Sequence, residues 1–399
     1  MTKLIITYLF YANLNMNLNK STTFTAKTFY GLENILAEEL KSLEAGNIRV
    51  LNRAVQFEGD KYLLYKSNIF LRTAIRILIP VEEFTVQSYD ELYNKAREIN
   101  WERYFTPYHT FFIDSSVNSK KIDHSHFAAL KLKDAIADFF RDKYRLRPSI
   151  DKINPDYRIN LHLSNNNCII SLDSSGESLH KRGYKTKNVK APLNEVLAAA
   201  LIKLSNWNHT ISFLDPMCGS GTLPIEAAMI AYNIPPNQNR KEYGFTNWQD
   251  YDEVLHRKIL DEIPEIPKGK ITSIEGRDIS EKAIEISKAN AKEAGLDGKI
   301  NFEQCAFESL EGHKLEKGII IMNPPYDLKL KKENINEFYT AIGSTLKKNF
   351  TGFDTWIFSG NKQAIKHIGL QPKQKITLFN GPVECKLEYY PIYKGTLKK

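Results

Sequence analysis

The sequence of 399 residues has few cysteines, and they are widely spaced. The four are Cys168, Cys218, Cys305 and Cys385, and no two of them lie close enough along the chain to form a zinc-chelating pair. They also provide no dense disulfide framework of the kind that small secreted domains need. This spacing favours a reducing compartment, so we expect a cytoplasmic protein with no metal site.

The sequence also lacks an apolar run long enough to cross a membrane. The apolar stretch near the N-terminus covers only residues 4–12, whereas a spanning helix needs about 20 residues. It lacks a small-residue cleavage site, which disfavours a signal peptide. We therefore expect residues 1–20 to be an extension outside the folded modules, and we expect no membrane partner.

Acidic residues are in the minority: 55 Lys and Arg against 47 Asp and Glu give a formal net charge of +8. With 42% hydrophobic and 26% charged residues, the composition excludes a collagen-like or disordered chain. The excess positive charge falls mainly in residues 120–190, while the second half is nearly neutral. A basic tilt favours a polyanionic partner without requiring one, and its segregation indicates that the two halves have different tasks.

Strand and helix patterns predict two α+β modules in the first half, at residues 21–80 and 81–176. The clearest helix is predicted over residues 125–144, and a hairpin is predicted around Asn165–Asn167. Residues 177–190 follow as a basic linker rather than a packed element. Its candidates for contact with a polyanion are Lys181, Arg182, Lys185 and Lys187.

From about residue 191 to residue 399, strands alternate with helices, which predicts an α/β fold with a doubly wound, parallel sheet. Residues 234–270 contain several prolines and are predicted to be an insertion between the first two strand–helix units.

A short glycine loop, residues 216–222, follows a predicted strand that ends at Asp215 and leads into a helix. Glycines let a ligand approach the backbone, and a helix N-terminus offers free N–H groups. The loop lacks the third glycine of a dinucleotide-binding loop, since residue 224 is proline. Asp215 would repel a pyrophosphate but can bind an ammonium group, which favours S-adenosylmethionine over NAD; a plain turn is the alternative. The candidate cofactor residues here are Asp215, Pro216, Cys218, Gly219, Gly221 and Thr222.

A second carboxylate, Asp278, lies just past the next predicted strand. An acid at this place can accept hydrogen bonds from both ribose hydroxyls of a nucleoside. Glu275 is the second candidate, and a helix N-cap or a surface acid is the alternative role for Asp278.

The tetrapeptide Asn323-Pro324-Pro325-Tyr326 directly follows a predicted strand over residues 318–322. The oxygens of the Asn323 side chain and the Pro324 carbonyl can accept the two N–H bonds of an amino group on a heteroaromatic ring. The lone pair of that amino group would then face a methyl donor, while Tyr326 stacks on the base. We therefore predict Asn323, Pro324 and Tyr326 as catalytic, with Asn323 also bordering the cofactor.

These motifs together resemble a known family. Residues 215–222 with residues 323–326 resemble the amino-methyltransferase branch of the class I S-adenosylmethionine enzymes. Residues 178–184, 191–200 and 71–74 resemble the THUMP-containing bacterial 23S rRNA guanine-N2 methyltransferases, in their stand-alone form.

The resemblance implies a Rossmann-like domain with a mostly parallel seven-stranded sheet, preceded by a ferredoxin-like and a THUMP module. It implies S-adenosylmethionine as cofactor, 23S rRNA as partner, and methylation of a guanosine N2 amino group without a metal or an obligate protein partner. It also implies that the ferredoxin-like and THUMP modules bind RNA. At residues 304–307 the sequence departs from the family, because the acid that usually binds the adenine amino group is absent. Backbone groups and packing on Phe307 are the expected substitutes.

Three alternatives to this function stay open. They are a tRNA guanine-N2 methyltransferase, a DNA adenine-N6 methyltransferase and a non-catalytic RNA-binding assembly factor.

Overall fold

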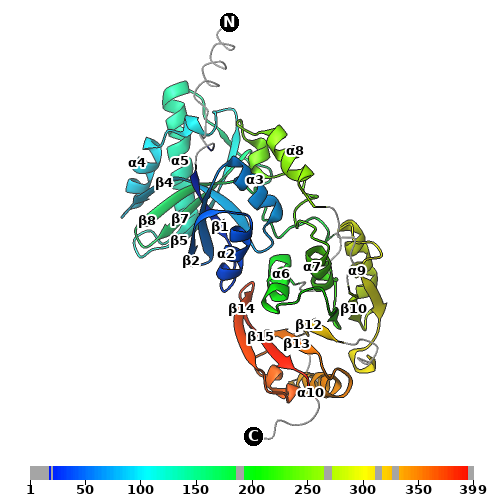
Figure 1. The fold of residues 1–399 in the computed structure, drawn as a ribbon. Helices are drawn as coiled ribbons and strands as arrows, with labels where there is room; N and C mark the ends of the chain where they lie inside the picture. Colours follow the sequence, from blue (N-terminus) through cyan, green and yellow to red (C-terminus); the bar gives the residue numbers. More distant parts are fainter. Residues whose placement is uncertain are drawn as a thin grey trace.

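The strands of the chain form two sheets that lie one above the other in an elongated molecule (Figure 1). The computed structural model describes residue 18 and residues 21–185, 193–264, 272–310, 317–325 and 332–393. Within these residues, the upper sheet has 8 strands in the order β2-β3-β1-β4-β8-β7-β5-β6. The lower sheet has 7 strands in the order β11-β10-β9-β12-β13-β15-β14.

The first module is built from strands and two helices. Its elements are β1 (Thr22–Lys27), α2 (Glu33–Ser42), β2 (Gly46–Leu51), β3 (Ala54–Gly59), α3 (Lys61–Phe70) and β4 (Arg76–Thr85). Alternating buried side chains such as Phe24 and Ala26 make β1 a central strand, paired antiparallel with β3 and β4. Asp60 caps α3 by accepting a hydrogen bond from the Leu63 amide at 2.9 Å.

The second module continues the same sheet. Its elements are α4 (Tyr89–Glu98), η1 (Trp101–Arg103), β5 (Thr110–Asn118), α5 (Ser125–Tyr144), β6 (Ser149–Ile150), β7 (Tyr157–Ser164) and β8 (Asn167–Asp173). The helix predicted over residues 125–144 is confirmed by α5. The predicted hairpin is confirmed by the pairing of Ser164 with Asn167, where Asn165 takes the positive φ of +55° that the tight turn needs.

Strand β4 joins the two modules into one sheet. Arg76–Leu78 pair with β1, and residues from Leu78 to Thr85 pair with β8. The predicted boundary at residue 80 therefore falls inside a strand. Pro80, which has no N–H to donate, lies where the pairing with β8 shifts register.

The second half forms the lower sheet and its helices. Its elements are α6 (Glu195–Leu204), β9 (Ser212–Asp215), α7 (Thr222–Ala231), η2 (Gly244–Asn247), α8 (Glu253–Asp261), β10 (Ile274–Asp278), α9 (Glu281–Glu293), β11 (Asn301–Gln304), η3 (Phe307–Ser309), β12 (Gly318–Met322), α10 (Lys332–Asn349), β13 (Asp354–Ser359), η5 (Ala364–Ile368), β14 (Gln374–Asn380) and β15 (Val383–Pro391). Strands β11, β10, β9, β12 and β13 run parallel, while β15 runs antiparallel to both of its neighbours. In the described part of the chain, this confirms the expected α/β fold with a mostly parallel, seven-stranded sheet.

Helices cover both faces of the lower sheet, because its strands alternate apolar side chains toward two cores. Ile319 and Ile321 of β12 face a core shared with α6, α7 and α9. Ile320 and Met322 face a second core with α10 and η5. Burial on both faces is the usual condition of a parallel sheet.

The segment between α7 and β10 packs against the upper half of the molecule, and it lies where an insertion was predicted. Tyr243, Phe245 and Trp248 belong to the core of the 8-stranded sheet rather than to the cores of the lower sheet. Phe245 stacks on Tyr65 with ring centroids 4.0 Å apart. This segment, which we call the brace, therefore connects the two halves by packing.

No helix in the described ranges has the length and apolar character needed to cross a membrane.

Candidate active site at the carboxyl edge of the parallel sheet

Three predicted site residues meet at one edge of the lower sheet. Asp215 ends β9, Asp278 ends β10, and Asn323 directly follows β12. These strands are parallel neighbours in the order β10-β9-β12, so their carboxyl ends lie together. Doubly wound sheets bind their ligands in the crevice outside this edge, which we call the active-site edge.

The glycine loop is held rigidly against α9. Gly219 and Gly221 have φ angles of +56° and +80°, which favour glycine. A Cβ on Gly221 would lie 3.0 Å from the Cβ of Ser287. The Ser287 hydroxyl donates to the Gly219 carbonyl at 2.9 Å, and the Asn290 amide donates to the Ser220 carbonyl at 3.0 Å. The loop is therefore a built feature that begins α7, not a surface turn.

Cys218 packs inside this loop. It is buried, with its Sγ 3.8 Å from the Ser287 hydroxyl. Burial raises the pKa of its thiol well above the ordinary value, and the charge of Asp215 adds to the rise. A protonated, buried thiol is a packing group rather than a nucleophile.

Asp215 is a buried carboxyl next to the loop. Its Oδ1 accepts a hydrogen bond from the Met217 amide at 3.1 Å. Burial raises its pKa well above the usual range; the Met217 N–H opposes this, and the negative charge of Asp278 adds to it. No lysine or arginine among the described residues forms an ion pair with it. A cationic ligand group at this place would favour the charged carboxylate, as expected for the ammonium of an amino acid moiety.

Asp278 is held in place by backbone donors. Its Oδ2 accepts from the Gly219 amide and its Oδ1 from the Ser280 amide, both at 2.9 Å. The cap of α9 is Ser280, so the alternative of an N-cap role does not apply to Asp278. Glu275, the second candidate, is bonded to Arg277 at 2.6 Å. Each oxygen of Asp278 retains accepting capacity, which suits a pair of ribose hydroxyls.

Asn323 carries an orphaned acceptor. Its Oδ1 is buried and forms no hydrogen bond within the described structure. A buried carbonyl oxygen without a donor is costly, and such an atom at an active-site edge suits an N–H group supplied by a substrate. Pro324 beside it is buried, while Tyr326 lies outside the described residues.

Phe307 belongs to the core beneath this edge. It is buried with Leu214 and Met322, and its ring stacks on Phe350 with centroids 5.8 Å apart. The Cys305 amide donates to the Asp278 carbonyl at 3.0 Å, which brings the segment that starts with Cys305 beside the ribose candidate. Packing of adenine against Phe307 stays a prediction.

The expectation that the basic linker is an unpacked, RNA-facing segment is wrong for two of its side chains. Arg182 is buried and bonds Glu226 of α7 at 2.7 Å, with side-chain exposures of 1% and 0%. Lys185 is largely buried and pairs with Glu195 at 3.2 Å. Lys181 is exposed and pairs with Glu177, and Lys187 lies outside the described residues. The positive charges of Arg182 and Lys185 are therefore used within the protein.

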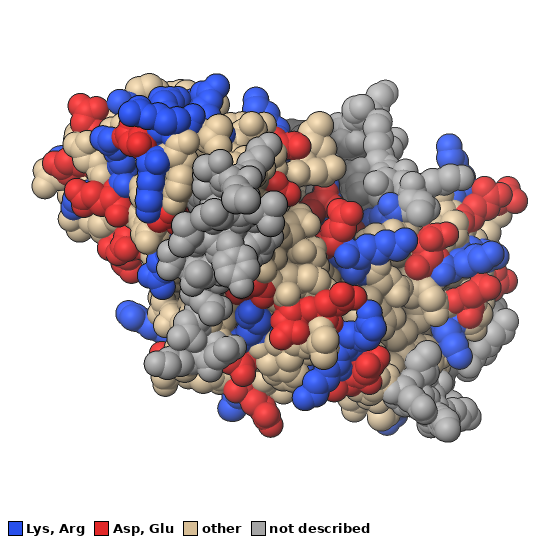
Figure 2. Space-filling view, turned by 90° about the horizontal axis from the view of Figure 1, so that it is seen from above, with Lys and Arg blue, Asp and Glu red and all other residues tan. Residues whose placement is uncertain are grey.

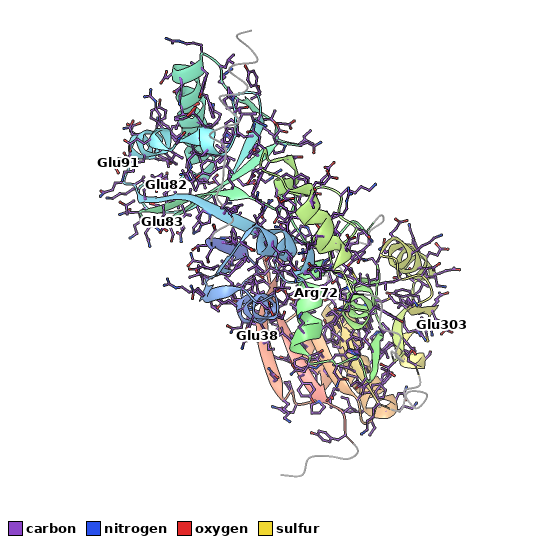
Figure 3. The ribbon with its side chains drawn as sticks, turned by 45° about the horizontal axis from the view of Figure 1, so that its top comes forward. Glu38, Arg72, Glu82, Glu83, Glu91 and Glu303 are labelled. Atoms are coloured by element: carbon purple, nitrogen blue, oxygen red, sulfur yellow. The ribbon has the colours of Figure 1, made fainter. Side chains whose placement is uncertain are left out.

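A buried polar junction that the sequence analysis missed explains this burial. Arg72, which Figure 3 shows between the two sheets, donates to the Met229 and Ile234 carbonyls at the end of α7. Arg182 donates to the Arg72 carbonyl at 2.7 Å. Burial lowers the pKa of Arg72 to about 10, while the charge of Glu226 opposes this. One sequence signal existed: Glu226 is the only charged residue in the apolar helix Thr222–Ala231.

Comparison with known proteins accounts for all three parts of the chain. Residues 182–389 match the family described as "RMKL-like, methyltransferase domain". The chain belongs to this family. Residues 86–173 match the THUMP domain, and residues 23–78 match the "RlmL ferredoxin-like domain".

Individual relatives agree with this assignment. The "Putative RNA methyltransferase slr0064" of Synechocystis sp. is 37% identical over 91% of this chain and 95% of its own length. The "Ribosomal RNA large subunit methyltransferase K/L" of Syntrophotalea carbinolica is 36% identical over 92% of this chain, but the match spans only 53% of that protein. The chain thus spans about half the length of the K/L relatives. The solved structure of "SMU.472, a putative methyltransferase complexed with SAH" is 29% identical, with a TM-score of 0.84 over 94% of this chain and 100% of that one.

The RMKL-like chain is therefore an S-adenosylmethionine-dependent methyltransferase with an RNA substrate. The residues at the active-site edge fit this cofactor, since a buried carboxylate, a glycine loop at a helix N-terminus and a backbone-held second carboxylate adjoin one another. Within the described residues there is no group of three or more His, Cys, Asp or Glu side chains that could hold a metal ion.

Proposed function

We propose that this chain methylates the exocyclic N2 amino group of a guanosine in 23S ribosomal RNA, in the cytoplasm. The observation that carries the proposal is the orphaned Asn323 Oδ1 at the active-site edge. The RNA class rests on the match to the THUMP domain, and the ribosomal target rests on the names of the K/L relatives.

The protein's part in the reaction is positioning rather than strong acid–base chemistry. The bound cofactor supplies an electrophilic methyl group on a sulfonium. Asp215 would hold its ammonium group, and Asp278 would accept its ribose hydroxyls. The oxygens of Asn323 and Pro324 accept the two N–H bonds of the guanine amino group, which orients its lone pair toward the methyl group. Tyr326 stacks on the base, which must leave its helix to reach the site.

The proposed domain boundaries separate the RNA-binding part of the chain from the catalytic part. Residues 21–80 and 81–176 are the ferredoxin-like and THUMP modules that hold RNA. Residues 191–399 are the catalytic domain, and residues 177–190 connect the two parts through a segment whose Arg182 and Lys185 serve the junction.

An assay with separate nucleic acids tests the proposal. Purified protein is incubated with tritiated S-adenosylmethionine and, in turn, 23S rRNA, tRNA or duplex DNA from cells that lack the protein. We expect label in 23S rRNA, recovered as N2-methylguanosine. Label in tRNA alone, or in adenine of DNA, would contradict the target, and cofactor binding without transfer to any of them would contradict the enzyme.

A further inference from the structure

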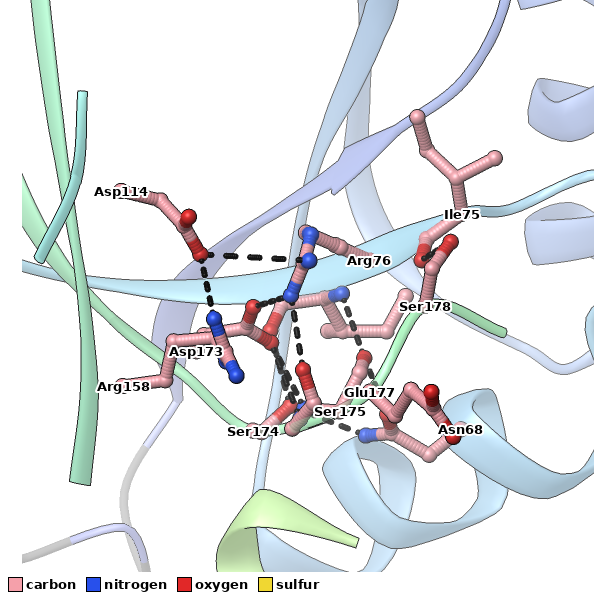
Figure 4. A network of polar contacts seen from close by, with 12 residues as sticks. Asn68, Ile75, Arg76, Asp114, Arg158, Asp173, Ser174, Ser175, Glu177 and Ser178 are labelled. Carbon is pink, nitrogen blue, oxygen red and sulfur yellow. Dashed lines mark hydrogen bonds and ion pairs between the residues drawn. The ribbon is translucent and has the colours of Figure 1, made fainter. Parts of the chain in front are cut away.

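Polar side chains at the active-site edge keep acceptor atoms without a partner in the described structure. In the upper half, by contrast, polar side chains bond one another, as Figure 4 shows for Arg158, which donates to Asp114 at 2.9 Å. The Asn323 Oδ1 is one unpartnered acceptor at the active-site edge, and the proposed function uses it. A second one belongs to Gln304, which has no role so far.

The places given to Asp215 and Asp278 determine the direction in which the cofactor lies. Asp215 ends β9 and is assigned the ammonium group, while Asp278 ends the neighbouring β10 and is assigned the ribose. In the cofactor the base is attached to the ribose, at the end remote from the ammonium group. The base therefore extends past β10 toward β11, which is the next strand of the sheet.

Ile279 offers an apolar surface at this place. It directly follows Asp278 and is 72% exposed. Single exposed apolar residues are common on protein surfaces, but this one adjoins the carboxylate assigned to the ribose. A purine ring laid on it would remove apolar surface from water, and this contact would not distinguish one purine from another.

Gln304 ends β11 and reaches toward the same place. It pairs in register with Asp278, so the two side chains lie on the same face of the sheet. Its Nε2 donates to the Ile279 carbonyl at 3.0 Å. The side chain of Gln304 is therefore tied to the residue that offers the apolar surface.

The bond to Ile279 determines which atom of the Gln304 amide is free. A carbonyl oxygen can only accept, so the amide presents its NH₂ group to Ile279. This leaves Oε1 as an acceptor, on an exposed side chain and without a donor among the described residues. An unused acceptor held beside an apolar surface suits a ring that carries an amino group.

The neighbouring residues offer no equivalent acceptor. The Ala306 carbonyl already accepts from the Ser309 amide at 3.1 Å and from the Cys305 thiol at 3.3 Å. A carbonyl oxygen has two lone pairs, so this one is fully used. The ring of Phe307 can pack on a base but has no acceptor atom for its amino group.

We propose that the Oε1 of Gln304 accepts a hydrogen bond from the amino group of the cofactor's adenine, while Ile279 covers one face of the ring. The inference rests on the cofactor placement in the proposed function and extends it to the base. Gln304 thereby makes the site selective for adenine over a purine that lacks the amino group.

The test compares two ligands of the full chain by calorimetry: S-adenosylhomocysteine and its deaminated analogue S-inosylhomocysteine. In the analogue a ring carbonyl replaces the amino group, so two acceptors would face each other at Gln304. A flip of the amide would sacrifice the bond to Ile279. We expect the wild type to bind S-adenosylhomocysteine at least about tenfold more tightly than the analogue.

Two substitutions of Gln304 separate recognition of the base from a structural role. Gln304→Met keeps the length of the side chain and removes both polar atoms, so the preference for S-adenosylhomocysteine should fall by about fivefold or more. Gln304→Glu keeps an acceptor and loses only the donor to Ile279, so it should retain the preference. A merely structural tie to Ile279 would be lost in both variants alike.

Two further variants serve as controls. Ile279→Ser should weaken both ligands about equally, because contact with the ring face does not involve the amino group. Glu303→Met alters the preceding residue of β11, labelled in Figure 3, whose side chain points to the opposite face and pairs with Arg277 at 3.3 Å. It should leave both affinities nearly unchanged.

An unchanged preference in Gln304→Met, or an equal loss of preference in the Met and Glu variants, would overturn the role of Gln304. No RNA enters this measurement, so its result is separable from the proposed function. If the variants behave as expected while wild type transfers no methyl group to 23S rRNA, only the proposed target is wrong. If Asp278→Asn binds both ligands as tightly as wild type, the cofactor placement itself is wrong.

Discussion

Single side chains at the active-site edge carry the chemistry, and a substitution of Asn323 tests that chemistry most sharply. Its acceptor oxygen has no partner in the described structure, and we assign that oxygen to the substrate amino group. We expect Asn323→Ala to lower kcat by about 100-fold or more, because a preorganised hydrogen bond to the reacting group is lost. Cofactor affinity, measured by calorimetry, should stay within a few-fold of wild type.

The conservative variant Asn323→Asp serves as the control. It keeps an accepting oxygen at the same place and should retain measurable activity. If Asn323→Ala instead abolished cofactor binding, the acceptor site would be misplaced.

A second residue-scale prediction concerns protons. Burial raises the pKa of Asp215 well above its usual range, and a cationic ligand group would favour its charged form. Cofactor binding at a pH between the usual carboxyl value and this raised pKa should therefore release a proton. Calorimetry in buffers of different ionisation enthalpy measures that proton directly.

The Asp215→Asn variant should show no such release and weaker cofactor binding. The same raised pKa makes the ligand-free protein less stable as pH rises through this interval, because the unfolded carboxyl gives up its proton more readily. Proton uptake on binding would contradict the assigned role of Asp215.

At the scale of elements, α7 connects the cofactor loop to the upper half. The helix begins at Gly221, and its Glu226 accepts from Arg182 at 2.7 Å and from Tyr184 at 2.9 Å. Burial raises the pKa of Glu226, while Arg182 and Arg72 oppose the rise. Removing one partner of a buried ion pair strands the other charge.

We therefore expect Glu226→Ala to reduce the free energy of unfolding by about 3–5 kcal/mol, measured by denaturant titration. The matched control is Glu253→Ala, which removes an exposed ion pair with Arg257 on α8 and should cost less than about 1 kcal/mol. Equal effects of the two substitutions would mean that the junction is not a structural tie.

The elements show what sequence patterns could and could not predict. Helix α5 and the hairpin after Ser164 were predictable, because local periodicity and turn residues determine them. The continuity of β4 across both modules was not, since pairing with β1 and β8 depends on contacts far apart in the sequence. The glycine loop, Asp278 and Asn323 were predictable because the site lies at strand ends. The burial of Arg182 was not, because its partner Glu226 lies in another module.

On the scale of the whole molecule, positive charge is distributed in a way that composition alone did not reveal. Figure 2 shows a cluster of Lys and Arg at one end of the molecule with Asp and Glu beside it, and both signs are interspersed over the rest of that face. Arg182 and Lys185 of the linker neutralise the buried carboxylates of Glu226 and Glu195, while Lys181 and the brace residue Lys241 lie at the surface. The two halves are therefore joined by a packed junction and not by a loose linker.

The central claim is that the active-site edge methylates a guanosine of 23S rRNA at N2. The most direct measurement is mass-spectrometric mapping of 23S rRNA from cells that lack the protein, complemented with wild type or with Asn323→Ala. We expect one N2-methylguanosine that is absent in the deletion, restored by wild type and not restored by the variant. An unchanged set of modified nucleosides in the deletion, or full restoration by Asn323→Ala, would contradict it.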